Sequence, residues 1–193
     1  WAAASSFWAY ICTRGSGKPE THSGRGRWKQ MNKEAVYALL RAQGIPFEVT
    51  EHGAVYTMAE LKDVPLPYPE ADAKNIFVRD DKKRQYYLLT VQGDKRVDLK
   101  AFRRAHGTRP LTFASAEELL SHLGLTPGAV SPMGLLNDAS GTVAWYVDEA
   151  LLAGRRIGLH PNDNTATVWM PTQAMIDLAR AHGNPVEVFS PEQ

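Results

Sequence analysis

The stretch AKNIFVRDDKKRQYYLLTV, residues 73–91, carries a run of charge between two segments of strand-like composition. In the first segment, Ile76 and Val78 fall on one face of an extended chain, with polar and aromatic residues on the other. The second segment, residues 86–91, is rich in aromatic and β-branched residues. The sequence therefore predicts a β-hairpin with residues 80–84 as its charged tip.

Lys74 and Asn75 stand at the entrance of the first predicted strand, and no acidic residue follows them before Asp80. A lysine at a strand edge commonly does no more than keep that edge soluble. Whether Lys74 has a further role depends on what the rest of the chain brings to it.

The chain has 193 residues, of which 44% are hydrophobic and 22% are charged, values typical of one ordinary soluble domain. No apolar run approaches the roughly 20 residues that span a bilayer, so we expect no membrane association. The absence of cysteine from residues 31–193 fits a reducing cytoplasm, where we expect the protein to act. Residues 1–30 show neither a helical nor a strand period and make a poor signal peptide. We interpret them as an expression remnant, a mis-assigned start or a disordered leader, and expect one folded domain over residues 31–193.

The predicted domain contains no cysteine, because the only one, Cys12, lies in the leader. That excludes a disulfide, a thiolate metal site and a cysteine nucleophile from the domain. Its five histidines show no H-x-H or H-E-x-x-H spacing, and no P-loop, G-x-S-x-G or G-x-G-x-x-G motif occurs. We therefore expect neither a metal site nor a cofactor.

Helix and strand signals are interleaved along the domain without a regular βαβ rhythm. Helix starts are marked by Asn32, by Asp98 and by two capping-box patterns, at residues 57–60 and 115–118. The predicted helices cover residues 32–43, 57–65, 98–106, 115–123 and 172–182. The predicted strands cover residues 47–51, 73–80, 86–91, 111–113, 130–136, 143–148, 156–160, 165–170 and 186–189. This inventory favours a single α+β domain in which a mixed β-sheet curls towards a barrel and is surrounded by helices.

Two polar loops are candidates for chemistry. In Gly128–Pro132, the glycine permits unusual backbone conformations and the proline stiffens the exit, so backbone N–H groups could point at a carbonyl or phosphate oxygen. The alternative is an ordinary turn between a helix and a strand. In His160–Thr165, a histidine at a strand end could orient a substrate or shuttle a proton. The alternative there is a polar turn with an exposed histidine.

A basic stretch runs from Arg79 to Arg109 through a domain that is otherwise acidic. The stretch holds ten lysines and arginines against four acids, whereas residues 31–193 as a whole carry 17 basic and 20 acidic side chains. Lys100, Arg103 and Arg104 fall on one face of the helix predicted there. Such a face can follow a phosphate backbone, or it can simply be solvated.

Four motifs, in order, resemble the YbaK/ProX superfamily of aminoacyl-tRNA deacylases, and especially its PrdX branch. The motifs are HGAVYTMAE (52–60), AKNIFVRD (73–80), GAVSPMGLLND (128–138) and IGLHPNDNTATVWM (157–170). The resemblance covers residues 31–189 and extends to the editing insertion domain of bacterial prolyl-tRNA synthetase. Four motifs in the right order are far more specific than any one of them alone.

The resemblance implies a freestanding hydrolase that removes a wrongly attached amino acid from tRNA in trans, with alanine on tRNA(Pro) as the expected substrate. Cysteine on tRNA(Pro) is the alternative, since relatives handle either with similar motifs. A third interpretation is a non-catalytic module of the same fold that binds tRNA or associates with a synthetase. The implied partners are the acceptor end of mischarged tRNA(Pro) and, transiently, prolyl-tRNA synthetase.

The resemblance also assigns roles to individual residues. It makes Lys74 central, as the group that holds the phosphate or ribose of the terminal adenosine, with Gly128 and His160 as its catalytic companions. The residues expected to contact substrate are Asn75, Ser131, Pro132 and Thr165. The basic residues expected to grip the acceptor stem are Arg79, Lys82, Lys83, Lys100, Arg103 and Arg104. Because an aminoacyl ester is already activated, water helped by the substrate's own ribose hydroxyl can attack it without a strong protein nucleophile.

The chain departs from the family pattern at Asn162 and Asp163, where many relatives carry apolar residues. If Asp163 faced the pocket, its charge would oppose an approaching phosphate.

Overall fold

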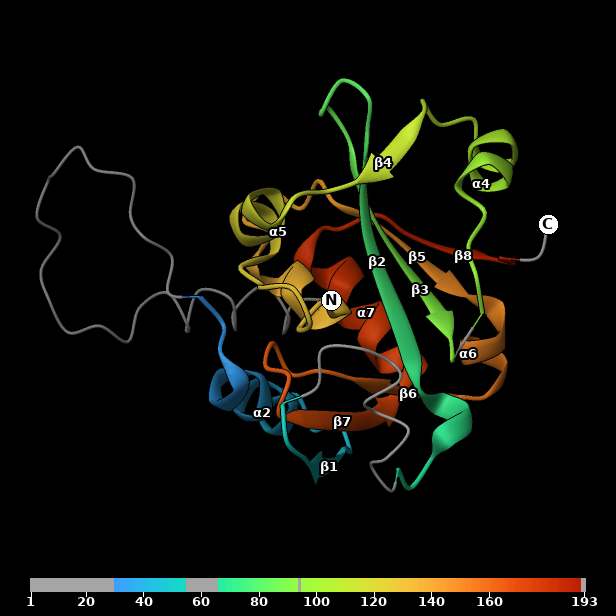
Figure 1. Ribbon diagram of the computed structural model, residues 1–193. Helices are drawn as coiled ribbons and strands as arrows, with labels where there is room; N and C mark the ends of the chain where they lie inside the picture. The colour runs from blue at the N-terminus through green and yellow to red at the C-terminus, as the bar shows by residue number, and fades with distance from the viewer. Residues whose placement is uncertain (1–29, 55–65, 94, 192–193) are drawn as a thin grey trace, which may run out of the picture.

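The predicted hairpin is the longest feature of the five-stranded sheet in the computed structural model, which describes residues 30–54, 66–93 and 95–191 (Figure 1). β2 (Ala73–Asp80) and β3 (Tyr86–Gln92) pair antiparallel, with Ala73 opposite Gln92 and Arg79 opposite Tyr86. The expected leader and the helix expected over residues 57–65 lie outside the described residues, except for Gln30. The remaining elements confirm the α+β class.

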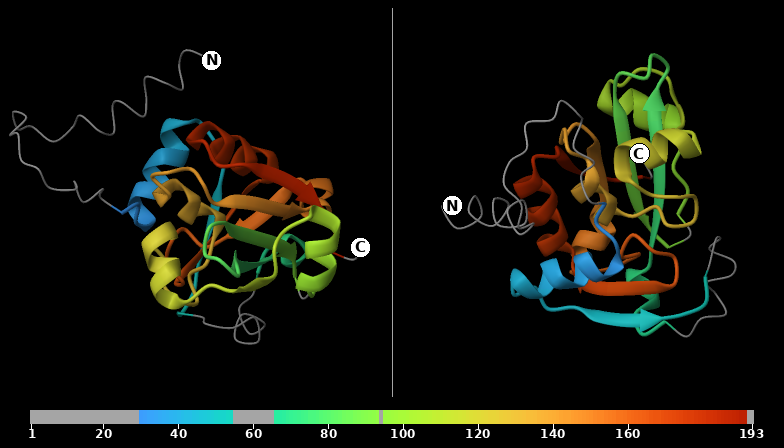
Figure 2. Two further views of the ribbon diagram at one scale, coloured as in Figure 1. Left: turned by 90° about the horizontal axis from the view of Figure 1, so that it is seen from above. Right: turned by 90° about the vertical axis from the view of Figure 1, so that its left-hand side faces the viewer.

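The strands form two sheets. The larger has the order β4-β2-β3-β5-β8, in which β4 (Leu111–Phe113) pairs antiparallel with β2, while β5 (Ala144–Asp148) and β8 (Val186–Phe189) continue in parallel from β3. The smaller is antiparallel, with the order β1-β7-β6, from β1 (Glu48–Glu51), β7 (Ala166–Pro171) and β6 (Arg156–Leu159). The smaller sheet lies across the end of the hairpin at which β2 begins, opposite the tip (Figure 2).

A single parallel bridge between Asp72 and Gly158 joins the two sheets. The connected surface is therefore curled, as expected, but it is not a closed barrel within the described residues. Gly158 is required there because the Trp169 ring packs against its backbone. A Cβ at position 158 would lie 2.4 Å from Cζ3 of that ring.

The hairpin is buried on both faces, which explains why β3 reads as a continuous apolar run. On one face Phe77 and Leu88 join the main core. On the other, Val78 and Leu89 join a smaller cluster with Phe102. Helices cover both sides: α2 (Lys33–Ala42), α5 (Ala116–Leu123) and α7 (Thr172–His182) pack on the main core, and α4 (Leu99–His106) covers the smaller cluster.

The local helix signals were reliable. Asn32 Oδ1 accepts the N–H of Ala35 at the start of α2. Ser115 and Glu118 form the predicted capping box, with each side chain bonded to the backbone of the other residue. These signals depend on residues a few positions apart, so the sequence alone contains all of the interaction.

The strand predicted over residues 130–136 was wrong. The segment is a 3₁₀ helix, η2 (Pro132–Asn137), capped by Ser131, whose Oγ accepts the N–H of Met133 at 3.2 Å. Its apolar run is buried in the main core, and a short buried helix and a buried strand have the same composition. Two further short helices, η1 (Pro69–Ala71) and α6 (Glu149–Ala153), were not predicted.

Among the described residues, no helix is long and apolar enough to cross a bilayer.

We expect Gly158→Ala to lower the free energy of unfolding by about 1–3 kcal/mol, because the new methyl group would overlap the buried Trp169 ring. Urea denaturation measures this directly. Gly53→Ala is the matched control, since a Cβ at that position meets nothing within 4 Å. Equal stability of the two variants would show that the contact at Gly158 is not restrictive.

Candidate functional site

His160 follows β6 and lies half-buried beside the Gly128 loop. Its ring donates a hydrogen bond to the backbone carbonyl of Gly128, so two residues 32 positions apart in the sequence meet here. Burial, reinforced by the nearby ring of His52, lowers the pKa of His160 to about 4. The imidazole is therefore neutral at pH 7, with one nitrogen donating and the other able to accept.

His52, at the end of β1, is a part of this site that sequence reasoning missed. Its ring centroid lies 6.0 Å from that of His160. Its Nδ1 lies 2.8 Å from the carbonyl oxygen of Gly53, and its Nε2 lies 3.0 Å from Oγ1 of Thr167. Since a carbonyl only accepts, Nδ1 carries the proton and Nε2 accepts from the hydroxyl of Thr167. The only signal in the sequence was that His52 opens the first of the four motifs.

Lys74 shares a sheet face with His160. Asp72 and Gly158 are bridged in parallel, and Lys74 and His160 each lie two residues further along their own chains. Because alternate residues of an extended chain point the same way, both side chains belong to the face that carries Gly158. Lys74 is half-buried, and no ion pair joins it to a described residue.

Asn75 points to the opposite face and is fixed by a buried chain of hydrogen bonds. Trp145 Nε1 donates to Oγ1 of Thr90 at 2.8 Å, and the Thr90 hydroxyl donates to Oδ1 of Asn75 at 2.8 Å. Trp145 and Thr90 are both fully buried. These two hydrogen bonds therefore hold the start of β2, next to Lys74, against the interior of the domain.

Less of the Gly128 loop is accessible to solvent than the sequence suggested. Gly128 has φ +91°, a conformation that favours glycine. Gly128 and Val130 are half-buried, whereas Ser131 and Pro132 are fully buried at the start of η2. The accessible part of the loop is thus its beginning, and the Ser131 hydroxyl is already used as a cap.

Thr165 and Asp163 bond to each other inside the loop between β6 and β7. The Thr165 hydroxyl and N–H both donate to Oδ1 of Asp163, and Lys33 Nζ lies 3.3 Å from Oγ1 of Thr165. The hydrogen bonds from Thr165 lower the pKa of Asp163 despite partial burial, and Lys33 and His160 lower it further. The departure from the family pattern therefore introduces a carboxylate that is engaged within its own loop.

Met31, just before α2, links the loop between β6 and β7 to the end of η2. Asn162, with φ +61°, donates through Nδ2 to the carbonyl of Met31 at 2.7 Å. The N–H of Met31 donates to Oδ1 of Asn137, at the end of η2, also at 2.7 Å. Asparagine tolerates this left-handed conformation better than most residues, which explains its presence at the turn.

Residues 52–178 match the family model of the aminoacyl-tRNA editing domain. The chain belongs to this family. Members of the family are aminoacyl-tRNA deacylases, so the chain is an enzyme of that class. The resemblance stated from the four motifs is confirmed.

The relatives include proteins connected with prolyl-tRNA. The prolyl-tRNA editing protein ProX of Acetoanaerobium sticklandii is 38% identical over 152 residues, which are 79% of this chain and 93% of that protein. The prolyl-tRNA synthetase associated domain-containing protein 1 of Mus musculus is 31% identical over 149 residues, covering 75% of this chain and 88% of that one. A crystal structure described as a candidate trans-editing enzyme for prolyl-tRNA synthetase superposes with a TM-score of 0.61 at 25% identity, covering 82% of this chain and 96% of that chain.

The basic stretch of the editing domain is less positive than its sequence suggests. Glu118, from outside the stretch, pairs with both Arg79 and Lys83 at 3.0 and 3.1 Å. Although burial opposes it, the hydrogen bond from Ser115 and these two pairs lower the pKa of Glu118 to about 2. Two further cations of the stretch are also neutralised by ion pairs: Arg109 by Asp81 and Lys95 by Asp148.

Four of the expected tRNA-binding cations remain exposed without an ion pair to a described residue: Lys82, Lys100, Arg103 and Arg104. They lie at the hairpin tip and on α4. The tip is separated from Lys74 by the length of β2, about 20 Å at 3.3 Å per residue. Lys82, at the tip, can therefore reach only parts of a ligand remote from Lys74.

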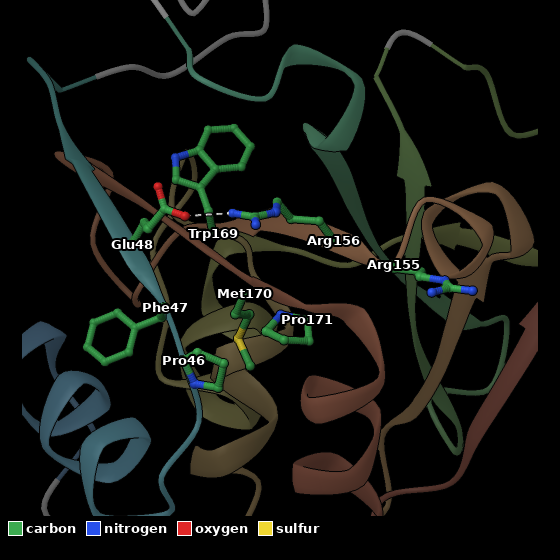
Figure 3. A pocket seen from close by; sticks show the side chains of 8 residues that line it. All are labelled: Pro46, Phe47, Glu48, Arg155, Arg156, Trp169, Met170 and Pro171. Carbon is green, nitrogen blue, oxygen red and sulfur yellow. Dashed lines mark hydrogen bonds and ion pairs between the residues drawn. The ribbon is translucent and has the colours of Figure 1, made fainter.

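A pocket of about 180 Å³ lies at the other end of the β6–β7 pair from His160 (Figure 3). Arg156 pairs there with Glu48 at 2.8 Å, and the ring of Trp169 is drawn above the pair in Figure 3. The guanidinium of Arg156 also lies 3.9 Å from the ring centroid of Tyr68. Two of the pocket's charged groups, Arg156 and Glu48, are thus already paired with each other. The place of the pocket in the fold separates it from the contact between His160 and Gly128. No cluster of potential metal ligands occurs among the residues that the structure describes.

Because the pKa of His160 is lowered, we expect the stability of the folded protein to depend on pH. Between pH 6.5 and about 4, the unfolded chain binds a proton at this imidazole that the folded chain does not. The contribution of the neutral ring to the free energy of unfolding is therefore fully present above pH 6.5. Below pH 6.5 this contribution falls by up to about 1.4 kcal/mol per pH unit.

We expect the stability difference between wild type and His160→Asn to shrink as the pH is lowered through this window and to be constant above it. Urea denaturation at a series of pH values measures the difference, and the contributions of all other titrating groups largely cancel. A difference that does not change between pH 6.5 and 4 would contradict a buried neutral imidazole.

Proposed function

We propose that the chain acts in trans to remove alanine from mischarged tRNA(Pro). The observation that carries this proposal is the meeting of His160 with the Gly128 loop, on the sheet face that also carries Lys74. The choice of tRNA(Pro) is based on the names of the relatives. The name of the bacterial editing protein and that of the mammalian protein both mention prolyl-tRNA or its synthetase. A transient contact with prolyl-tRNA synthetase belongs to the same proposal.

The substrate would enter with its terminal adenosine against Lys74. The ammonium group attracts the 3′-terminal phosphate or hydrogen-bonds the ribose, which fixes the ester relative to the sheet. Lys74 is suited to this because no described acid neutralises it. Binding a group next to the reacting bond, rather than attacking it, is the role we assign to this residue.

The ester carbonyl would lie at the accessible beginning of the Gly128 loop. Backbone N–H groups there can stabilise the negative charge that develops on the carbonyl oxygen as water adds. The hydrogen bond from His160 to the Gly128 carbonyl holds that part of the loop in place. Since His160 is neutral at pH 7, it can do so without adding a positive charge, and its second nitrogen can accept from water or from a ribose hydroxyl.

The amino acid removed is the least determined part of the proposal. A pocket sized for alanine excludes larger side chains by steric overlap, whereas one methylene group is worth only about 1–3 kcal/mol of discrimination. Cysteine on tRNA(Pro) is therefore the alternative substrate. Parallel hydrolysis of alanyl-, cysteinyl- and prolyl-tRNA(Pro) distinguishes them: loss of alanine alone supports the proposal, and a preference for cysteine replaces it with the alternative.

A non-catalytic role in binding tRNA or a synthetase is the competing function from another class. It predicts tRNA affinity without turnover of any of the three esters. Hydrolysis of one of them by wild type, in the absence of a synthetase, excludes it.

Lys74→Ala should lower the rate of single-turnover deacylation by about 10²- to 10³-fold, the loss typical of removing one preorganised electrostatic contact at a reacting ester. Lys74→Arg should retain part of the rate, since it keeps the charge. Arg41→Ala, on α2, is the control and should leave the rate at saturating enzyme unchanged. A Lys74→Ala variant with the wild-type rate would remove this lysine from the site.

The cations on α4 should hold phosphates of the acceptor stem. Arg103→Gln/Arg104→Gln should therefore weaken tRNA binding and flatten its salt dependence, by about 0.9 in the slope of log K against log salt for each phosphate that is no longer bound. Arg41→Gln/Arg180→Gln removes the same charge from α2 and α7 and serves as the control. If both double variants have the same slope, the tRNA lies on another surface.

A further inference from the structure

β2 has a neighbouring strand along the whole of one edge, but only at the two ends of the other edge. On the first edge it pairs with β3 from Ala73 to Arg79. On the second edge, Asp72 is bridged to Gly158 at one end, and β4 pairs with residues 78–80 at the other (Figure 1). Between these two contacts no described strand pairs with β2, so a short stretch of this edge is open.

The hydrogen bonds at the two ends of β2 show which backbone groups point to the open edge. The N–H of Gly93, just after β3, donates to the carbonyl of Asp72 at 2.8 Å. Even-numbered residues of β2 therefore direct their backbone groups to β3, because this direction alternates along a strand. The N–H of Ala114, just after β4, donates to the carbonyl of Phe77 at 3.1 Å. Odd-numbered residues thus direct theirs to the other edge.

Ala73 and Asn75 are the odd-numbered residues of the open stretch. No hydrogen bond joins the carbonyl of Ala73, or the N–H and carbonyl of Asn75, to a described residue on this edge. Residues 73–76 are all half-buried, whereas Phe77 and Val78 are buried, so solvent reaches β2 at the open stretch. Backbone groups in such a place are normally satisfied by water or by a ligand.

The open edge faces the segment that carries His160. His160 lies two residues beyond Gly158, as Lys74 lies two residues beyond Asp72, so continued parallel pairing would set His160 opposite Lys74. The structure has no such bridge between these two described residues, and the ring of His160 instead donates to the carbonyl of Gly128. The unpaired backbone of β2 is therefore next to the groups already assigned to the ester.

We propose that the aminoacyl group of the substrate binds to this open edge as a strand of one residue would. Its α-ammonium donates to the carbonyl of Ala73, and its ester carbonyl accepts from the N–H of Asn75. One residue of a parallel strand makes the same pair of contacts, to positions two apart on its neighbour, and unpaired sheet edges bind extended peptides in this way.

The proposal rests on the proposed function, because it assumes that an aminoacyl ester is the substrate. It adds the N–H of Asn75 to the donors that the Gly128 loop offers to the ester carbonyl. It also accounts for recognition of the free amino group by a backbone carbonyl, without a carboxylate.

Amide hydrogen exchange, followed by NMR, tests the contact with 3′-alanylamino-3′-deoxyadenosine, in which an amide replaces the ester and is not hydrolysed. In the free protein the N–H of Asn75 should exchange much faster than that of Ile76, which is directed to β3. The analogue should slow exchange at Asn75 about ten-fold or more, because its carbonyl replaces water as the acceptor. Exchange at Ile76, the matched control on the same strand, should not change.

The contact to the amino group is tested by 3′-propionylamino-3′-deoxyadenosine, which lacks it. This analogue should bind about ten-fold or more weakly, since a hydrogen bond from a charged donor is lost. Asp163→Asn is the matched protein variant, because Asp163 is an ionised carboxylate three residues from His160 and is the alternative partner for an ammonium group. The variant should bind the alanyl analogue about as tightly as wild type.

Exchange at Asn75 that millimolar analogue leaves unchanged, or protection confined to residues 128–131, would overturn the proposal. A loss of affinity in Asp163→Asn as large as that from removing the amino group would also overturn it, since a carboxylate would then hold the ammonium. The proposed function fails separately, if wild type does not hydrolyse any of the three aminoacyl-tRNA(Pro) esters. A wild type that cleaves one of them without protection of Asn75 by the analogue contradicts only the contact at the edge of β2.

Discussion

The bridge between Asp72 and Gly158 is the constraint on which the site depends. It is the point at which two separately formed sheets become one curled surface, and it sets the start of β2 beside the end of β6. Lys74 and His160, 86 positions apart in the sequence, share a face because each lies two residues beyond this pair. The bridge in turn depends on the absence of a side chain at Gly158, where the ring of Trp169 fills the space.

Burial then decides the chemistry of the residues that the bridge brings together. His160 is neutral at pH 7 because desolvation and the ring of His52 both oppose its protonation. Its partner is a backbone carbonyl of the Gly128 loop, so the ring orients that loop without competing with Lys74 for an anion. A site built in this way suits an ester that is already activated, for which positioning and charge stabilisation are sufficient.

The sequence predicted those features that depend on neighbouring residues. The hairpin at residues 73–91, the Asn32 cap and the Ser115 capping box all formed as expected, because their interactions span a few positions. Features that depend on distant residues were missed. The strand expected at residues 130–136 is a buried 3₁₀ helix, and the charge of the basic stretch is reduced by Glu118, which lies 39 positions from Arg79.

A double-mutant cycle on single-turnover deacylation of alanyl-tRNA(Pro) tests most directly whether Lys74 and His160 form one site. It compares wild type, Lys74→Ala, His160→Asn and the double variant. Because residues that act on one transition state have non-additive effects, the double variant should lose much less than the product of the two single losses. Losses that multiply in full would show that the two residues act independently, and would contradict a single site on this face of the sheet.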